Sequence, residues 1–77
     1  MVALEDMRRF RIESTTVASV GYQPEPPTLE VELPSGAVYQ YYGVPVPVYS
    51  GLLTAAFRDC YFNVFVRGGG YQYSRVA

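Results

Sequence analysis

The chain has 77 residues, enough for one domain built around a single hydrophobic core. Its 49% hydrophobic and 17% charged residues exclude a disordered chain, and its net charge of −1 excludes the strongly basic field of a general nucleic-acid binder. The lack of His and the presence of one Cys exclude His-based catalysis, an ordinary zinc site and an internal disulfide. We therefore expect a protein without cofactor, metal or enzymatic activity.

Residues 1–13 have no clear hydrophobic period and are predicted to form an N-terminal arm, followed by a domain over 14–77. Arg8, Arg9 and Arg11 make a small basic cluster in this arm, but acidic residues flank it. No apolar run resembles a signal peptide or reaches the roughly 18–20 residues of a membrane span. We expect a cytoplasmic protein that does not bind membranes.

Three strands are predicted in the first half of the domain, over residues 15–22, 29–33 and 37–42. The first is rich in β-branched residues, and the loop 23–27 after it contains three prolines. The second alternates strictly, with Leu29, Val31 and Leu33 pointing into the core. Residues 34–36, Pro-Ser-Gly, predict a tight turn that pairs Val31 with Tyr39 and Leu29 with Tyr41.

Two short helices are predicted in the second half. Pro47 suits the start of the first, and Tyr49, Leu52, Leu53 and Ala56 have helical spacing. The second, over 59–67, would bury Tyr61, Phe62, Phe65 and Val66 and end at the glycines 68–70. Residues 71–76 alternate again, as an edge strand or an ordered tail. The predicted fold is α+β: a three-stranded antiparallel β-meander covered by two short helices, with a possible fourth C-terminal edge strand.

The order of these motifs resembles the KTSC domain over roughly residues 14–76. The motifs are Ser19-Val20-Gly21-Tyr22, Leu29-Glu30-Val31-Glu32-Leu33, Val38-Tyr39-Gln40-Tyr41, Val44-Pro45 with Val48-Tyr49 and Leu52-Leu53, and Tyr61-Phe62-Asn63. That family is named for a C-terminal extension of some lysyl-tRNA synthetases and also occurs as small single-domain bacterial and phage proteins. The resemblance implies a domain of unknown activity, with RNA binding as the first expectation. The chain departs from the family pattern at Pro47, where Ser is usual, and over 57–60, where relatives carry Ser, Gly and Lys.

Several side chains have both a structural and a functional interpretation. Tyr39 and Tyr41 could stack bases, but the predicted register places both in the core. Glu30 and Glu32 alternate outward, and we interpret them as solvated charges rather than a catalytic pair. Cys60 is interpreted as a semi-buried, chemically quiet thiol, because no His can act as its base.

The C-terminal half is the predicted binding surface, because residues 34–77 carry a charge of +2 and residues 1–33 a charge of −3. Arg and Tyr side chains together supply charge-assisted contacts and flat stacking surfaces. We therefore expect a non-enzymatic binding module whose partner is RNA, bound weakly and with strong salt dependence. The alternative is a protein-interaction or accessory module of a bacterium or phage. The candidate binding residues are Tyr42, Asn63, Arg67, Tyr71, Tyr73 and Arg75.

Overall fold

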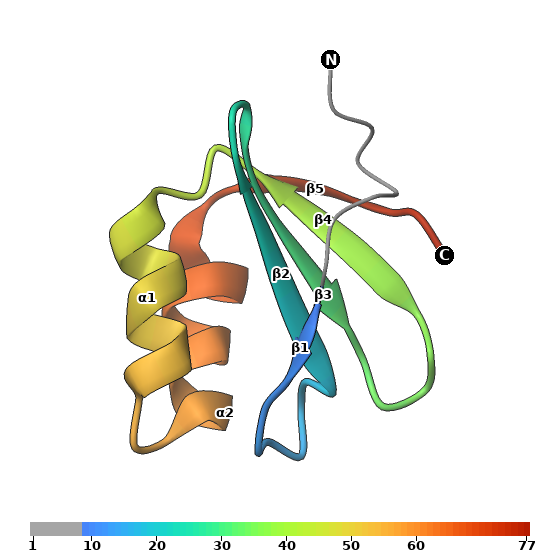
Figure 1. Cartoon of the computed structure of the whole chain (residues 1–77), viewed down its shortest axis with the longest axis vertical. Helices are drawn as coiled ribbons and strands as arrows, with labels where there is room; N and C mark the ends of the chain where they lie inside the picture. The colour runs from blue at the N-terminus through green and yellow to red at the C-terminus, as the bar shows by residue number, and fades with distance from the viewer. Residues whose placement is uncertain (1–8) are drawn as a thin grey trace.

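The computed structural model describes residues 9–77, which form a five-stranded antiparallel sheet with a helical layer on one face (Figure 1). The strands lie in chain order, β1 to β5, and the helical segments are inserted between β4 and β5. The strands are β1 (Phe10–Arg11), β2 (Ser19–Pro24), β3 (Pro27–Glu32), β4 (Val38–Tyr42) and β5 (Gln72–Arg75). The helical segments are α1 (Val46–Thr54), α2 (Arg58–Tyr61), the π-helical turn η2 (Phe62–Val66) and the 3-10 turn η3 (Arg67–Gly69).

The β3–β4 hairpin has the predicted register. Val31 pairs with Tyr39 and Leu29 pairs with Tyr41, and the Leu33 amide donates to the Ala37 carbonyl at 2.8 Å. Gly36 adopts a φ of 96°, the left-handed conformation that glycine tolerates and the predicted turn requires. The turn residues and the apolar alternation together determine this register.

The α+β class is confirmed, but the prediction of three strands is an undercount. Phe10 and Arg11 pair with Val20 and Ser19, so part of the expected arm becomes the edge strand β1. A two-residue strand is too short to show a detectable alternation. The C-terminal segment adds the other edge, β5, which pairs with β4.

β2 begins at Ser19 rather than at Thr15 because the preceding residues form a loop around Asp59. The Asp59 carboxylate accepts hydrogen bonds from the hydroxyls of Ser14 and Thr15 and from the amides of Thr15 and Thr16. The Ser14 hydroxyl is the largest influence, followed by Thr15, and these bonds hold the pKa of Asp59 at about 2. Asp59 thereby joins the loop before β2 to the start of α2.

The first helix begins close to the predicted position. Pro45 rather than Val46 is the N-cap, and the helix ends at Thr54, so Ala56 lies beyond it. Leu52 is fully buried against the sheet. Gly51 is required by packing, since a Cβ there would lie 2.1 Å from the hydroxyl oxygen of Tyr61. That hydroxyl donates to the Val48 carbonyl at 2.9 Å and connects the two helical segments.

The second predicted helix is present, but its helix type changes along its length from α to π to 3-10. Phe62 and Val66 are fully buried as predicted, but the prediction for Phe65 is wrong, because its side chain is 52% exposed. Residues 62–66 form a π-helical turn, which is wider than an α-helical turn and rotates Phe65 away from the sheet. Gly70, with a φ of 79°, ends the helical segment as predicted.

The other face of the sheet carries a buried polar group instead of solvated charges. Glu30 is only 4% exposed; it accepts from Arg9 at 2.5 Å and from the Gln40 amide nitrogen at 3.0 Å. Glu32 is half-buried and accepts from the Ser19 hydroxyl at 2.8 Å. The prediction that both carboxylates are solvated is therefore wrong, since partners from neighbouring strands and from Arg9 cover them.

The core lies between the helical layer and the sheet. Tyr41 meets the ring of Phe62 edge-on, with centroids 6.1 Å apart, and Tyr22 stacks on Tyr49 at 4.9 Å. The buried cluster therefore joins β2, β3 and β4 to both helical segments. Its members are Val17, Val20, Leu29, Val31, Tyr41, Val44, Leu52, Phe62 and Val66.

Candidate functional site

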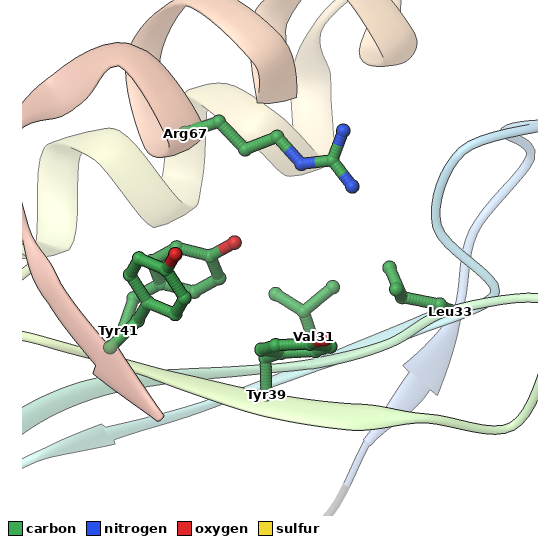
Figure 2. Close-up of a pocket in the computed structure, with 6 residues that line it drawn as sticks. Val31, Leu33, Tyr39, Tyr41 and Arg67 are labelled. Carbon is green, nitrogen blue, oxygen red and sulfur yellow. The ribbon is translucent and has the colours of Figure 1, made fainter. Parts of the chain in front are cut away.

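A pocket of about 360 Å³ opens between the C-terminal end of the helical segment and the sheet. Its lining comes from three strands and from the 3-10 turn, so β3, β4, β5 and η3 all contribute. Figure 2 shows Arg67 reaching across the opening, opposite the sheet residues that form the floor. The lining residues are Val31, Leu33, Tyr39, Tyr41, Arg67 and Tyr73, and none of them is acidic.

Arg67 is held over this pocket by two contacts within its own helical segment. Its guanidinium carbon lies 5.3 Å from the centroid of the Phe62 ring, a cation–π distance. One terminal nitrogen, Nη1, donates to the Oδ1 atom of Asn63 at 3.4 Å. The four-residue spacing of Asn63 and Arg67 brings the two side chains together, as predicted. These contacts orient the guanidinium and leave further N–H donors for a ligand.

The tyrosines form a connected aromatic surface on β4 and β5. The Tyr73 ring lies 5.4 Å from that of Tyr41 and 6.1 Å from that of Tyr39. Tyr41 is only 6% exposed, whereas Tyr73 is 62% exposed. Burial raises the pKa of the Tyr41 hydroxyl, and the nearby Arg67 opposes that rise. The surface thus runs from the core outward to solvent.

The structure brings together four of the six candidate residues on one side of the sheet. Arg67 and Tyr73 line the pocket, and Asn63 holds Arg67. Arg75 pairs with Tyr39 across β4 and β5, so both project from the same face, and its Nε donates to the Ala77 carbonyl at 3.2 Å.

The other two candidates lie outside this group. Tyr71 is half-buried and packs against the core beside Gly69. Tyr42 follows Tyr41 on β4 and therefore projects from the opposite face, where its hydroxyl hydrogen-bonds the Ser74 hydroxyl at 2.5 Å. Tyr42 is thus separated from the pocket by the sheet itself.

Sequence reasoning placed Tyr39 and Tyr41 in the core and so omitted both from the candidate site. Their register was right, since both project toward the helical layer. That layer leaves the turn end of the β3–β4 hairpin uncovered, and Tyr39 is only half-buried there. The Tyr-x-Tyr pattern was the available signal, but the extent of helical cover cannot be derived from alternation.

Other potentially reactive groups are dispersed. Cys60 is exposed, contrary to the semi-buried position expected for it. Within residues 9–77, no group of three or more His, Cys, Asp or Glu side chains is placed to hold a metal ion. No helix in that same part of the chain is both long and apolar enough to cross a membrane. The pocket under Arg67 therefore remains the candidate site.

Comparison with known proteins agrees with the resemblance seen in the sequence. The model of the KTSC domain matches residues 13–71. The chain belongs to the KTSC domain family. A KTSC domain protein from Yersinia pestis has a similar crystal structure, with a TM-score of 0.85 and 25% identity, over 92% of this chain and 99% of that one.

Two relatives in sequence contain regions similar to this chain. An uncharacterized protein of Stutzerimonas stutzeri is 40% identical over 70 residues, which are 91% of this chain and 99% of that protein. A lysine–tRNA ligase of Nostoc is 34% identical over 65 residues, which are 84% of this chain and 11% of the ligase. The KTSC domain is thus similar both to a protein of its own size and to a small part of a much larger enzyme.

Proposed function

We propose that this KTSC domain protein is a small non-enzymatic module that binds single-stranded RNA. The observation that supports this function is the guanidinium of Arg67 held across an open pocket from tyrosine rings, with no acidic lining residue. A planar base stacks on such rings, and the guanidinium attracts the electron-rich base edge or a phosphate. The pocket is the binding site in this proposal, and Tyr73 and Arg75 form its rim.

Single-stranded RNA fits this site better than a duplex does. A pocket of about 360 Å³ lies at the small end of the range for ligand sites, about 300–1,000 Å³. A base can enter it only when it is unpaired and turned out of its stack. A duplex would instead require a broad basic surface, and residues 34–77 carry a net charge of only +2.

The similarity to a lysine–tRNA ligase is a second support. The name of that relative identifies a tRNA as the molecule on which the whole enzyme acts, and the matched region is 11% of its length. A domain that contacts RNA suits an enzyme that acts on a tRNA. RNA is for this reason the first ligand to test for the present chain.

The test is a titration of fluorescently labelled single-stranded RNA, followed by anisotropy at several salt concentrations. With Arg67 and Arg75 near the nucleic acid, log Kobs should fall with log salt with a slope between about −0.7 and −1.4. Arg67→Ala should weaken binding by about tenfold or more, since a hydrogen bond to a charged group is lost. Arg75→Ala should reduce mainly the salt slope.

Arg11→Ala is the matched control for these variants. It removes the same charge, but from β1, the edge of the sheet farthest from β5. Its affinity should stay within about twofold of wild type if long-range charge effects are screened. Equal losses in Arg11→Ala and Arg67→Ala would contradict a site at the pocket. Absence of RNA binding by the folded wild-type protein would refute the function.

A protein-interaction module is the second candidate, and exposed apolar side chains on the helical segment favour it. Phe57 is 80% exposed, Val64 54% and Phe65 52%. Apolar contacts of that kind depend only weakly on salt, whereas RNA binding through Arg67 and Arg75 should weaken as salt rises, with the slope given above. Binding of a protein that is insensitive to salt and to Arg67→Ala would support this second function.

A further inference from the structure

The chemistry of the pocket lining allows a more specific statement, which rests on the RNA-binding function proposed above. We infer that Arg67 makes the pocket select guanine over adenine, the other purine. Arg67 is the one charged side chain among the described residues that line the pocket, and a guanidinium can donate hydrogen bonds but cannot accept them. The other polar lining groups are the hydroxyls of Tyr39, Tyr41 and Tyr73, which can do either. The site therefore favours a ligand that presents several hydrogen-bond acceptors.

Arg67 is also fixed well enough to recognise a particular edge. Asn63 occupies one hydrogen of Nη1 at 3.4 Å, and the Phe62 ring supports the guanidinium at 5.3 Å. Figure 2 shows the guanidinium turned over the floor formed by Val31 and Tyr39, where a ligand in the pocket can reach its N–H groups. The guanidinium is a planar fork of N–H donors. Because contacts on one side already hold it in place, it loses less conformational entropy on binding than a free side chain would.

Guanine presents the edge that suits this fork. Its O6 and N7 atoms are adjacent acceptors, and a guanidinium can donate to both at once. Adenine places an N6 amino group, a donor, beside its N7, so a donor would face a donor. Unpaired cytosine also has two adjacent acceptors, O2 and N3, so the discrimination expected from Arg67 is the one between the two purines. Uracil has carbonyl acceptors but no adjacent pair on one edge. In unpaired RNA the guanine edge is free for this contact.

The test compares RNAs of about seven nucleotides, a length within the range of single-strand binding sites. Each consists of uridine with one central base: guanine, adenine, or 7-deazaguanine, in which N7 is replaced by carbon. The guanine RNA should bind the wild-type protein about tenfold more tightly than the adenine RNA, which is within the discrimination expected of a bidentate pair. The 7-deazaguanine RNA should lose most of that advantage.

Arg67→Ala is the decisive variant, because it removes every side-chain donor at this position, whereas a Lys could still donate to O6 and N7 of guanine. Its preference for guanine over adenine should fall below about twofold, while it still binds all three RNAs. Its folding is verified by a thermal transition close to that of wild type. Asn63→Ala should weaken the preference in the same direction, because it frees the guanidinium.

Each outcome has a definite meaning. Equal affinity of the wild-type protein for the guanine and adenine RNAs overturns the inference and leaves RNA binding as the function. A guanine preference that survives Arg67→Ala also overturns it, since another group must then recognise the base. Failure of the wild-type protein to bind any of the RNAs refutes the proposed function together with the inference.

Discussion

Glu30→Ala removes a buried carboxylate from the face of the sheet opposite the helices. Glu30 is 4% exposed and accepts hydrogen bonds from Arg9 and Gln40. The Gln40 side chain is itself 4% exposed, so its amide would lose a partner that water cannot readily replace. The Arg9 side chain is 32% exposed, so water can solvate it when Glu30 is removed. The Arg9–Glu30 ion pair therefore contributes less to stability than the Gln40 hydrogen bond.

The expected loss follows from these two contacts. A buried hydrogen bond to a charged group contributes about 1.5–3 kcal/mol, and a partly exposed ion pair adds less than about 1 kcal/mol. We expect Glu30→Ala to lower the free energy of unfolding by about 2 kcal/mol. For a domain of this size that corresponds to a decrease in Tm of about 8–16 °C.

Thermal and urea unfolding, followed by circular dichroism, measure this change. Glu25→Ala is the control, because Glu25 lies exposed in the β2–β3 turn and should change stability by less than about 0.5 kcal/mol. If Glu30→Ala is as mild as Glu25→Ala, Glu30 is solvated, and the assignment of a buried polar group on this face is refuted.

Four further substitutions test the packing and the hydrogen bonds of Asp59. Tyr41→Ala should cost about 3 kcal/mol or more in unfolding experiments because Tyr41 is buried, whereas Tyr39→Ala at the open pocket should cost about half as much or less. Equal losses would contradict this difference. Gly51→Ala should destabilise the protein, despite a gain in helix propensity of about 1 kcal/mol, because the new Cβ displaces the Tyr61 ring; a rise in Tm would refute that packing. Asp59→Asn should be less stable than wild type at neutral pH. Since the pKa of Asp59 is lowered from 3.8 to about 2 on folding, its contribution is present above pH 3.8 and disappears as the pH falls through 2. The difference between the two proteins should therefore narrow on acidification, and a constant difference would contradict the role of the carboxylate.

The parts of the fold that were predictable depend on neighbouring residues in the sequence. The β3–β4 register follows from the Pro-Ser-Gly turn and from the alternation on either side of it. The helix start near Pro47 and the stop at Gly70 also follow from local backbone preferences. These features require no information about distant contacts.

The features that were missed depend on contacts between distant residues. Asp59 bonds the loop at residues 14–16, and Arg9 pairs with Glu30, with no local pattern that relates the partners. The exposure of Phe65 follows from a π-helical turn, which three-to-four-residue spacing does not anticipate. Strand and helix patterns identify faces well, but they do not show what covers a face.

The candidate site was predicted in part for the same reason. Asn63 and Arg67 were correctly paired by their helical spacing. The C-terminal segment was predicted as an edge strand or an ordered tail, and the structure shows the edge strand, paired with β4. The pocket floor was not predicted, because Tyr39 is accessible only where the helical layer ends. A pattern of apolar alternation is the same for a covered strand and for one that lines a pocket.

The central claim is that RNA binds at the pocket under Arg67. Its most direct test is the change in backbone amide chemical shifts when a guanine-containing single-stranded RNA is titrated into the labelled protein. The largest changes should occur at Tyr39, Tyr41, Arg67 and Tyr73, with little change at Phe10 and Arg11 on β1, the edge of the sheet farthest from β5. Changes concentrated on the helical surface around Phe57 and Phe65, with the pocket residues unaffected, would contradict the claim.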